Sequence, residues 1–338
     1  MTRLLSRNLS TRIRRLIPSP LSGLRSRTPP LPTTLTVDPG DVCNLRCPLC
    51  PTGAGLPGGS RFLMPLSTFQ VVVDKIPFLK NLWLFNWGEP FLNPALFDMI
   101  DYAGRRSIRV TVHTNFSFHR DDSFFADIVG SGLDRLTLSL DGASQASYSR
   151  YRVRGDFDLV IANVHRLIRA RSLAGSDTPV ITWKFVVNTH NEHEIAQARA
   201  MAADLGIAFQ ASPIGLSDDL PDAELPGSIE QRMADWLPAN RDYILDRYLG
   251  EYRTPLNPGP CTQLTTTLVV GPDGKVFPCC WVTDPANAFG DLLTESIEEI
   301  WANGAYRYSR SLFARTRYRG PRPPTICLKC RNFTRERA

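Results

Sequence analysis

The sequence lacks several features that would place it in other classes of protein. No apolar run approaches the length that a helix needs to cross a bilayer. No secretory signal is evident, and the eight cysteines are absent from the whole stretch between residues 50 and 261. A secreted disulfide scaffold spreads its cysteines through a small chain. Metal or cluster ligation in a reducing cytoplasm explains these cysteines better, and we expect a cytoplasmic protein.

Acidic residues are missing from the first 37 positions, which carry seven arginines. The whole chain has 39 basic and 33 acidic residues, so 32 basic residues remain when these seven arginines are left out. The body is therefore nearly neutral, and we expect no nucleic-acid partner. Residues 1–34 are also rich in proline, so we predict a disordered basic tail. Membrane contact through that tail is the less favoured alternative.

Short apolar runs alternate six times with longer amphipathic stretches along residues 35–215. The expected strands cover residues 35–37, 82–85, 108–112, 136–140, 180–187 and 207–210, and the expected helices cover 65–76, 94–105, 122–130, 157–173 and 192–205. This alternation is typical of parallel β/α units. We therefore predict an α/β fold, a partial (β/α)6 barrel of the TIM type. In such barrels, functional residues gather on the loops after the strands.

The chain after residue 215 has a different character. Residues 216–258 predict a helical bridge, with a helix over 228–249. Residues 259–338 predict a small C-terminal domain made of a β-hairpin and a helix. Its hairpin pairs 268–270 with 275–277 across an Asp-Gly turn, and its helix covers 296–311.

A triad of cysteines, Cys43, Cys47 and Cys50, follows the first expected strand with the spacing C-x3-C-x2-C. Three thiolates on one loop can hold three corners of a [4Fe–4S] cube and leave its fourth iron open. An open iron can bind a small molecule through an amine and a carboxylate. The alternatives are a zinc knuckle and a redox loop. The spacing and its place resemble the radical S-adenosylmethionine (radical SAM) superfamily, in which the open iron chelates SAM.

Polar residues at later strand ends extend this resemblance. Gly88-Glu89-Pro90, preceded by Trp87, resembles the GGEP motif that receives the ammonium group of SAM. The resemblance further implies SAM contacts by the strand-end residues Thr114, Asn115, Ser139 and Asp141. For each motif, an ordinary strand-end turn is the alternative.

Three other positions stand out. Lys184 interrupts an apolar strand, so it meets an anion (a carboxylate of SAM or of the substrate) or points to solvent. Leu49 stands where the family has an aromatic residue against adenine. His113 and His119 are left without a role, since single histidines near strands are more often structural.

A second group of cysteines resembles the SPASM/twitch extension of radical SAM enzymes. It comprises Cys261, the pair Cys279-Cys280, and Cys327 and Cys330, with the hairpin and the run Ile297–Trp301 between them. Five cysteines imply one auxiliary [4Fe–4S] cluster, with Cys261, Cys279, Cys327 and Cys330 as its ligands. Cys280 is then spare, and it could donate a hydrogen atom to a substrate radical. A zinc ribbon is the alternative.

The resemblance implies an enzyme that reductively cleaves SAM to a 5′-deoxyadenosyl radical and abstracts hydrogen from its substrate. The expected partner is an electron donor such as flavodoxin or ferredoxin. Residues 1–34 are short and Pro-rich for a peptide-recognition domain, so we predict a small polar substrate, a sugar or aminocyclitol, that is dehydrogenated or epimerised. A SPASM-type peptide maturase is the alternative. A non-catalytic protein stabilised by zinc or a cluster is the alternative from another class.

Overall fold

The computed structural model describes residues 28–55, 62–217, 225–245, 248–249, 261–282, 284–314 and 318–330. Most of the predicted N-terminal tail and much of the predicted bridge lie outside these ranges. No helix in the described part is long and apolar enough to cross a membrane.

Nine strands form one sheet, in the order β6-β5-β4-β3-β2-β1-β7-β8-β9. The barrel strands are β1 (Thr34–Val37), β2 (Asn81–Leu84), β3 (Arg109–Thr114), β4 (Arg135–Ser139), β5 (Val180–Val187) and β6 (Ala208–Pro213). They pair in parallel with their sequence neighbours, as the alternating pattern predicts. The predicted partial barrel is thereby confirmed.

The C-terminal hairpin continues this sheet. Strand β7 (Thr267–Val270) pairs in parallel with β1, and β8 (Lys275–Phe277) and β9 (Gly290–Asp291) follow in antiparallel order. The hairpin was predicted from its Asp-Gly turn, but its pairing with the first strand was not. That pairing joins segments more than 200 positions apart, so no local pattern reports it.

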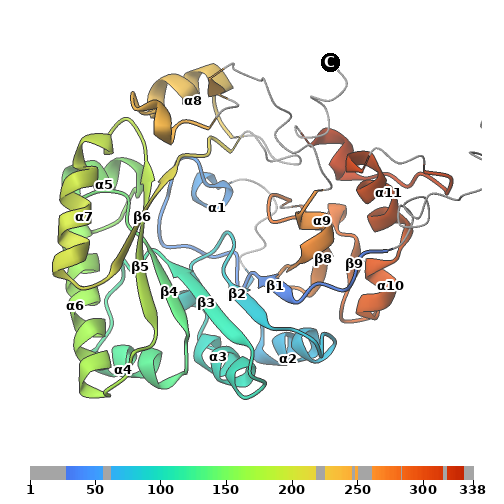
Figure 1. The fold of residues 1–338 in the computed structure, drawn as a ribbon, viewed down its shortest axis with the longest axis horizontal. Coiled ribbons are helices and arrows are strands. Elements are labelled where there is room, and N and C mark those ends of the chain that lie inside the picture. The colour runs from blue at the N-terminus through green and yellow to red at the C-terminus, as the bar shows by residue number, and fades with distance from the viewer. Residues whose placement is uncertain are drawn as a thin grey trace, which may run out of the picture. The chain divides into compact units, whose positions relative to one another are not determined.

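Helices cover one face of the curved sheet (Figure 1). They are α2 (Leu66–Asp74), α3 (Leu96–Gly104), α4 (Asp122–Gly130), α6 (Phe157–Leu173) and α7 (Ile195–Asp204). Alternate strand residues are fully buried beneath them, as Trp183, Phe185 and Val187 are on β5. The residues between them, such as Lys184, are half-buried on the opposite face, which lines the inside of the barrel.

Three helix predictions need correction. The helix α5 (Gln145–Tyr151), begun by the side-chain cap of Ser144, was not expected. The helix predicted over 228–249 is the shorter α8 (Ile229–Trp236), because the residue before Pro238 is extended. The helix predicted over 296–311 is divided into α10 (Ile297–Trp301) and α11 (Gly304–Phe313), since Asn303 caps a new helix.

The remaining elements are short. They are α1 (Pro51–Ala54), α9 (Gln263–Thr266) and the 3-10 turns η2 (Pro90–Leu92), η3 (Glu192–Glu194), η4 (Arg241–Tyr243), η6 (Pro285–Asn287) and η7 (Ile326–Lys329). Two of them lie in the loops that carry predicted site residues, because α1 follows Cys50 and η2 contains Pro90.

Candidate active site

The first three cysteines lie on one tight loop between β1 and α1. The backbone N–H of Cys50 donates to the carbonyl of Cys47 at 3.2 Å, and Cys50 then precedes the first residue of α1. Gly53 lies against this loop so closely that an added Cβ would stand 2.4 Å from the carbonyl oxygen of Cys47. A residue with a side chain would therefore push α1 away from the loop.

The three thiols share one electrostatic environment. Burial raises the pKa of Cys43 to about 12, with smaller contributions from negative charge on Glu89, Cys47 and Cys50. Burial likewise raises the pKa of Cys47 and of Cys50. In the described ranges, no three His, Cys, Asp or Glu side chains surround a common point as ligands of one metal ion. The donor set itself is three buried thiols, and thiolates at these positions need a cationic group such as an iron–sulfur cluster.

The second-strand motif packs directly against the cysteine loop. The backbone N–H of Glu89 donates to the carbonyl of Val42 at 2.8 Å. At Gly88 there is no room for a side chain, since a Cβ would stand 1.7 Å from the carbonyl oxygen of Gly40. The buried carboxylate of Asp38 accepts from the N–H groups of Gly40 at 3.3 Å and of Trp87 at 3.1 Å. It therefore connects the residues just before the cysteine loop to the turn after β2.

Glu89 is buried and braces the end of β3. Its carboxylate accepts from the hydroxyl of Thr114 and from the N–H of Asn115, each at 2.7 Å, and from the N–H of Phe91 at 3.2 Å. Desolvation raises the pKa of Glu89 to about 7, although these donors oppose the shift. The structure thus brings together four residues predicted from separate strand ends, because Pro90 begins the turn that directs Glu89 toward Thr114 and Asn115.

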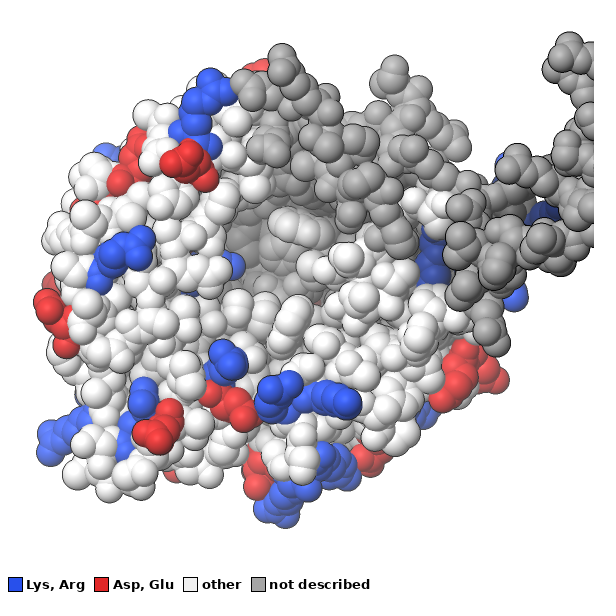
Figure 2. Space-filling view, in the orientation of Figure 1, with Lys and Arg blue, Asp and Glu red and all other residues white. Residues whose placement is uncertain are grey.

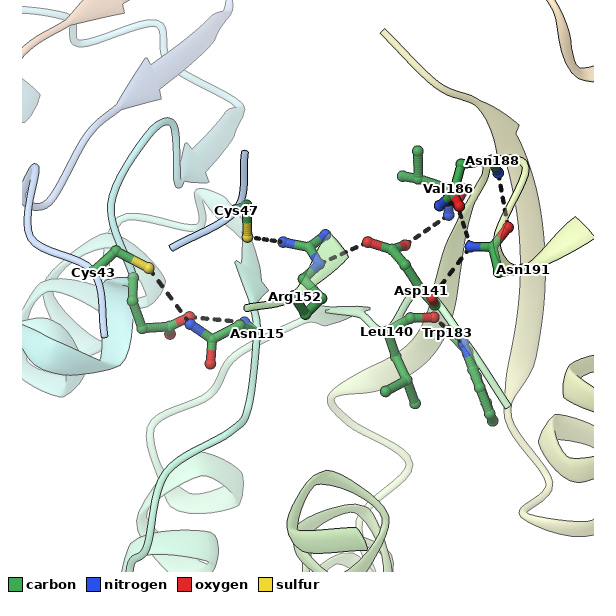
Figure 3. A network of polar contacts seen from close by, with 11 residues as sticks. Cys43, Cys47, Asn115, Leu140, Asp141, Arg152, Trp183, Val186, Asn188 and Asn191 are labelled. Carbon is green, nitrogen blue, oxygen red and sulfur yellow. Dashed lines mark hydrogen bonds and ion pairs between the residues drawn. The ribbon is translucent and has the colours of Figure 1, made fainter. Parts of the chain in front are cut away.

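Side-chain amides connect the residues at the end of β3 to the first cysteine. The amide of Asn115 lies 3.7 Å from the sulfur of Cys43 (Figure 3). It also donates to the side-chain oxygen of Asn44 at 2.9 Å. Asn44 in turn donates to the carbonyl of Ser117 at 2.7 Å. An N–H group near a ligating sulfur is one of the features by which proteins tune iron–sulfur clusters.

Arg152 stands beside the second cysteine, and sequence reasoning missed it. Its Nη1 lies 3.7 Å from the sulfur of Cys47, and its Nε donates to Asp141 at 2.6 Å (Figure 3). The other carboxylate oxygen of Asp141 accepts from the N–H of Val186 at 2.7 Å. The side chains of Arg152 and Asp141 are 16% and 0% exposed, so this is a buried ion pair.

The predicted strand-end residues therefore differ in availability. Asp141 is already bound within the chain, whereas Ser139 and Lys184 pair in register on β4 and β5 and are half-buried toward the barrel interior. His113 also lies there, stacked on Phe85, while His119 is exposed. Leu49 is buried in a separate apolar group with Ile214 and Leu216, and its carbonyl accepts from Ser217 at 2.5 Å.

The C-terminal cysteines also lie near one another. Burial raises the pKa of Cys279 well above its usual range, with further increases from Cys280, Cys327 and Cys330. Cys327 has its pKa raised to about 11 by burial, and both Cys330 and Cys261 add to the shift. All five cysteines of this group thus interact electrostatically, which fits the sulfur donor set of an auxiliary cluster.

Trp87 links the two cysteine groups. Its indole N–H donates to the carbonyl of Cys280 at 2.9 Å, and its ring meets that of Trp281 edge to face at a centroid distance of 5.8 Å. The residue that departs from the glycine of the GGEP motif therefore makes the contact with the second group. Figure 2 shows a hollow in this face of the molecule, between β5 and β8 of Figure 1, with mostly uncharged residues along the described part of its rim.

Comparison with known proteins gives this arrangement its family. The model of the radical SAM superfamily matches residues 37–200, and that of the SPASM iron–sulfur cluster-binding domain matches residues 261–331. The chain is similar to the mycofactocin maturase MftC of Mycolicibacterium smegmatis, with 25% identity over 317 residues, which cover 89% of this chain and 76% of MftC.

Two solved structures share the fold. SuiB of Streptococcus suis, bound to the precursor peptide SuiA, aligns with a TM-score of 0.58 and 14% identity over 82% of this chain and 66% of SuiB. The enzyme anSMEcpe, with bound AdoMet and the Cp18Cys peptide, aligns with a TM-score of 0.58 and 15% identity over 84% of each chain. The chain belongs to the radical SAM superfamily and carries a C-terminal SPASM domain, so its cofactors are the radical SAM [4Fe–4S] cluster, SAM and the SPASM auxiliary cluster.

Proposed function

We propose that this radical SAM enzyme modifies a peptide by abstracting hydrogen from one of its residues. The observation that carries the proposal is the similarity to the maturase MftC, which extends over 89% of the chain and so includes both cysteine groups. Two proteins of the same fold have been solved with peptides bound. These relatives support the peptide alternative better than the sugar or aminocyclitol that the sequence analysis favoured.

In this proposal, Cys43, Cys47 and Cys50 hold the first cluster and leave one iron for SAM. With SAM bound to it and one electron received from a donor such as flavodoxin or ferredoxin, the first cluster would supply a 5′-deoxyadenosyl radical. The surrounding chain orients and shields it. Glu89 and the amide of Asn115 fix the loop that carries Cys43, and Arg152 places positive charge beside Cys47.

The second cysteine group serves as the auxiliary site. We assign its ligands to Cys261, Cys279, Cys327 and Cys330; in support, neighbouring cysteines of this group add to the raised pKa of Cys279 and of Cys327. Cys280 remains outside this set, and its carbonyl is held by Trp87. An auxiliary cluster at this place can exchange an electron with a substrate radical formed inside the barrel.

An anaerobic reconstitution tests the catalytic assignment. Iron per chain is counted, and 5′-deoxyadenosine is measured after dithionite and SAM are added. We expect about eight irons for two cube clusters. Replacing Cys43, Cys47 and Cys50 together by Ala should abolish 5′-deoxyadenosine formation and leave about four irons at the C-terminal site. Full SAM cleavage by that triple variant would refute the assignment.

Substrate class needs a separate assay. Short peptides encoded next to the gene, and a panel of sugars and aminocyclitols, are incubated with the reconstituted enzyme and followed by mass spectrometry. The proposal predicts a mass change in a peptide that depends on SAM and reductant. A modified sugar with every peptide unchanged would restore the small-substrate hypothesis.

A further inference from the structure

Helix α11 presents three polar side chains on one side. Tyr306, Ser309 and Arg310 are spaced i, i+3 and i+4, so they form one polar face of the helix. Tyr306 and Ser309 are the buried residues of α11, and each is 0% exposed. The helix contacts α9 (Figure 1) and the turn η7. Buried polar groups need hydrogen-bond partners, so the bonds of this polar face show which segments the helix holds.

Ser309 belongs to a chain of hydroxyl groups that leads to Cys327. Its Oγ lies 2.7 Å from the Oγ1 of Thr325, and that oxygen accepts from the N–H of Cys327 at 3.3 Å. Burial raises the pKa of Cys327 to about 11, and hydrogen bonds from both hydroxyls to its sulfur oppose this shift. Hydrogen bonds to the ligating sulfurs are one of the features that set the reduction potential of an iron–sulfur cluster. The hydroxyl of Ser309 would therefore stabilise the reduced cluster, which is the more negative form.

The other two residues of the polar face hold the other two cysteine segments. The hydroxyl of Tyr306 donates at 3.3 Å to the carbonyl of the last residue of β8, two residues before Cys279. The Nε of Arg310 donates at 2.8 Å to the carbonyl of Leu264 in α9, the helix that begins two residues after Cys261. Together with the link to η7, these bonds join one helix to all three segments that carry the proposed ligands.

Arg310 also brings a positive charge into this domain. Its guanidinium lies over the rings of Trp301 at 4.1 Å and Tyr306 at 4.7 Å, and no carboxylate among the described residues pairs with it. Its Nη2 is buried and has no hydrogen-bond partner in the described part of the chain. A buried cation without an anion is unfavourable, whereas a cluster held by four thiolates is itself an anion. The charge of Arg310 therefore suits a domain that holds such a cluster.

We propose that the polar face of α11 positions the ligands of the auxiliary cluster and raises the reduction potential of that cluster. Tyr306, Ser309 and Arg310 are positioning residues, because they act through the cysteine segments that they hold. The hydroxyl of Ser309 and the charge of Arg310 favour the reduced cluster in addition. This inference rests on the ligands proposed above for the auxiliary site and is independent of the substrate.

The test is a redox titration of the reconstituted holoenzyme, followed by EPR. Added SAM identifies the signal of the first cluster, because only that cluster binds SAM, and the triple Ala variant described above shows the auxiliary signal alone. At a fixed potential, we expect Ser309→Ala to lower the ratio of reduced to oxidised auxiliary cluster about threefold, which corresponds to about 30 mV for one electron. The ratio for the first cluster should not change.

Matched variants separate this effect from a general disturbance of the helix. Ser311→Ala makes the same change on α11, but its hydroxyl donates to the carbonyl of Tyr308 within the helix, so the ratio should stay the same. Thr325→Ser keeps the hydroxyl and should keep the ratio. Arg310→Met should lower the ratio about threefold as well, whereas Arg310→Lys, which keeps the charge, should lower it less. Arg307→Met removes an exposed charge from the same helix and should have no effect.

Several results would overturn the inference. Unchanged auxiliary potentials in Ser309→Ala and Arg310→Met would refute it, and equal shifts of both clusters would assign the effect to the fold as a whole. Equal effects of Arg310→Met and Arg310→Lys would refute the role of the charge.

The proposed ligands are tested separately. Iron that persists at the auxiliary site in Cys327→Ala would refute the ligand assignment. A normal auxiliary potential in Ser309→Ala, together with loss of that iron in Cys327→Ala, would refute only the role of α11.

Discussion

The contact between Gly88 and the cysteine loop makes the sharpest structural prediction. Replacing Gly88 by Ala places a Cβ 1.7 Å from the carbonyl oxygen and 2.7 Å from the carbonyl carbon of Gly40. Both neighbours are backbone atoms, so no side-chain rotation relieves the overlap. The turn after β2 and the loop that leads to Cys43 must move apart.

The cost of this separation can be estimated from the contacts that it breaks. Overpacking of a tight site costs about 1–3 kcal/mol. The hydrogen bond from the N–H of Glu89 to the carbonyl of Val42, 2.8 Å long, is adjacent and would be lost, at about 1 kcal/mol. We therefore expect Gly88→Ala to lower the free energy of unfolding by about 2–4 kcal/mol. Because the shifted loop carries the first three cysteines, iron at that site should fall as well.

The assay compares Gly88→Ala with Gly104→Ala, a matched control at the last residue of α3. No heavy atom lies within 4 Å of a Cβ added at Gly104. That change should leave stability unchanged or raise it by about 0.5–1 kcal/mol, since Gly is the weaker helix former. Urea denaturation of the apoproteins and iron per reconstituted chain are measured side by side. A Gly88→Ala protein with normal stability and full iron would refute the close packing of this turn on the cysteine loop.

Three further changes probe other parts of the site. Arg152→Met should lower the free energy of unfolding by about 3–5 kcal/mol, because it leaves the buried Asp141 unpaired. Its control, Arg105→Met, breaks an exposed pair and should lower the free energy of unfolding by about 0.5 kcal/mol or less in the same urea assay. Equal effects of the two changes would contradict the difference in burial. Burial raises the pKa of Asp38 to about 7, so the folded chain holds this proton more tightly than the unfolded chain and the free energy of unfolding falls as pH rises from about 4 to about 7. Asp38→Asn should remove that part of the slope, and an unchanged slope between about pH 4 and 7 would count against it. Cys327→Ala should lose the iron of the auxiliary site while Cys280→Ala keeps it, and the reverse pattern of iron content would exchange the two assignments.

Local signals in the sequence were enough for most of the barrel. The bounds of α4 and α6 agree with the prediction because each begins at an aspartate, Asp121 or Asp156, whose side chain caps the first turn. Strand β5 agrees because its buried residues alternate with half-buried ones along the whole strand. The motif around Glu89 could be placed beside the cysteine loop only through its resemblance to the family, since the two segments are separated by a complete β/α unit.

Contacts between distant segments could not be predicted in this way. Arg152 contacts Cys47, which is 105 positions earlier in the chain. Its place between an expected strand and an expected helix gives no indication of a sulfur neighbour. The bond from Trp87 to the carbonyl of Cys280 spans 193 positions. In sequence, Trp87 was visible only as a departure from a glycine motif, and its partner became visible only in the folded chain.

These long-range contacts explain how the two cysteine groups keep a fixed relation to each other. Strand β7 pairs with β1 over four positions, from Thr34 with Thr267 to Val37 with Val270. The ladder continues to the next residue, since the N–H of Asp38 donates to the carbonyl of Val270 at 3.0 Å. The carboxylate of Asp38 then holds Trp87, which reaches Cys280. Asp38 thus connects the first strand to the turn after the second strand, and through Trp87 to the C-terminal cysteines. Hydrogen bonds of the sheet and of Asp38 therefore help to set the relative position of the two groups.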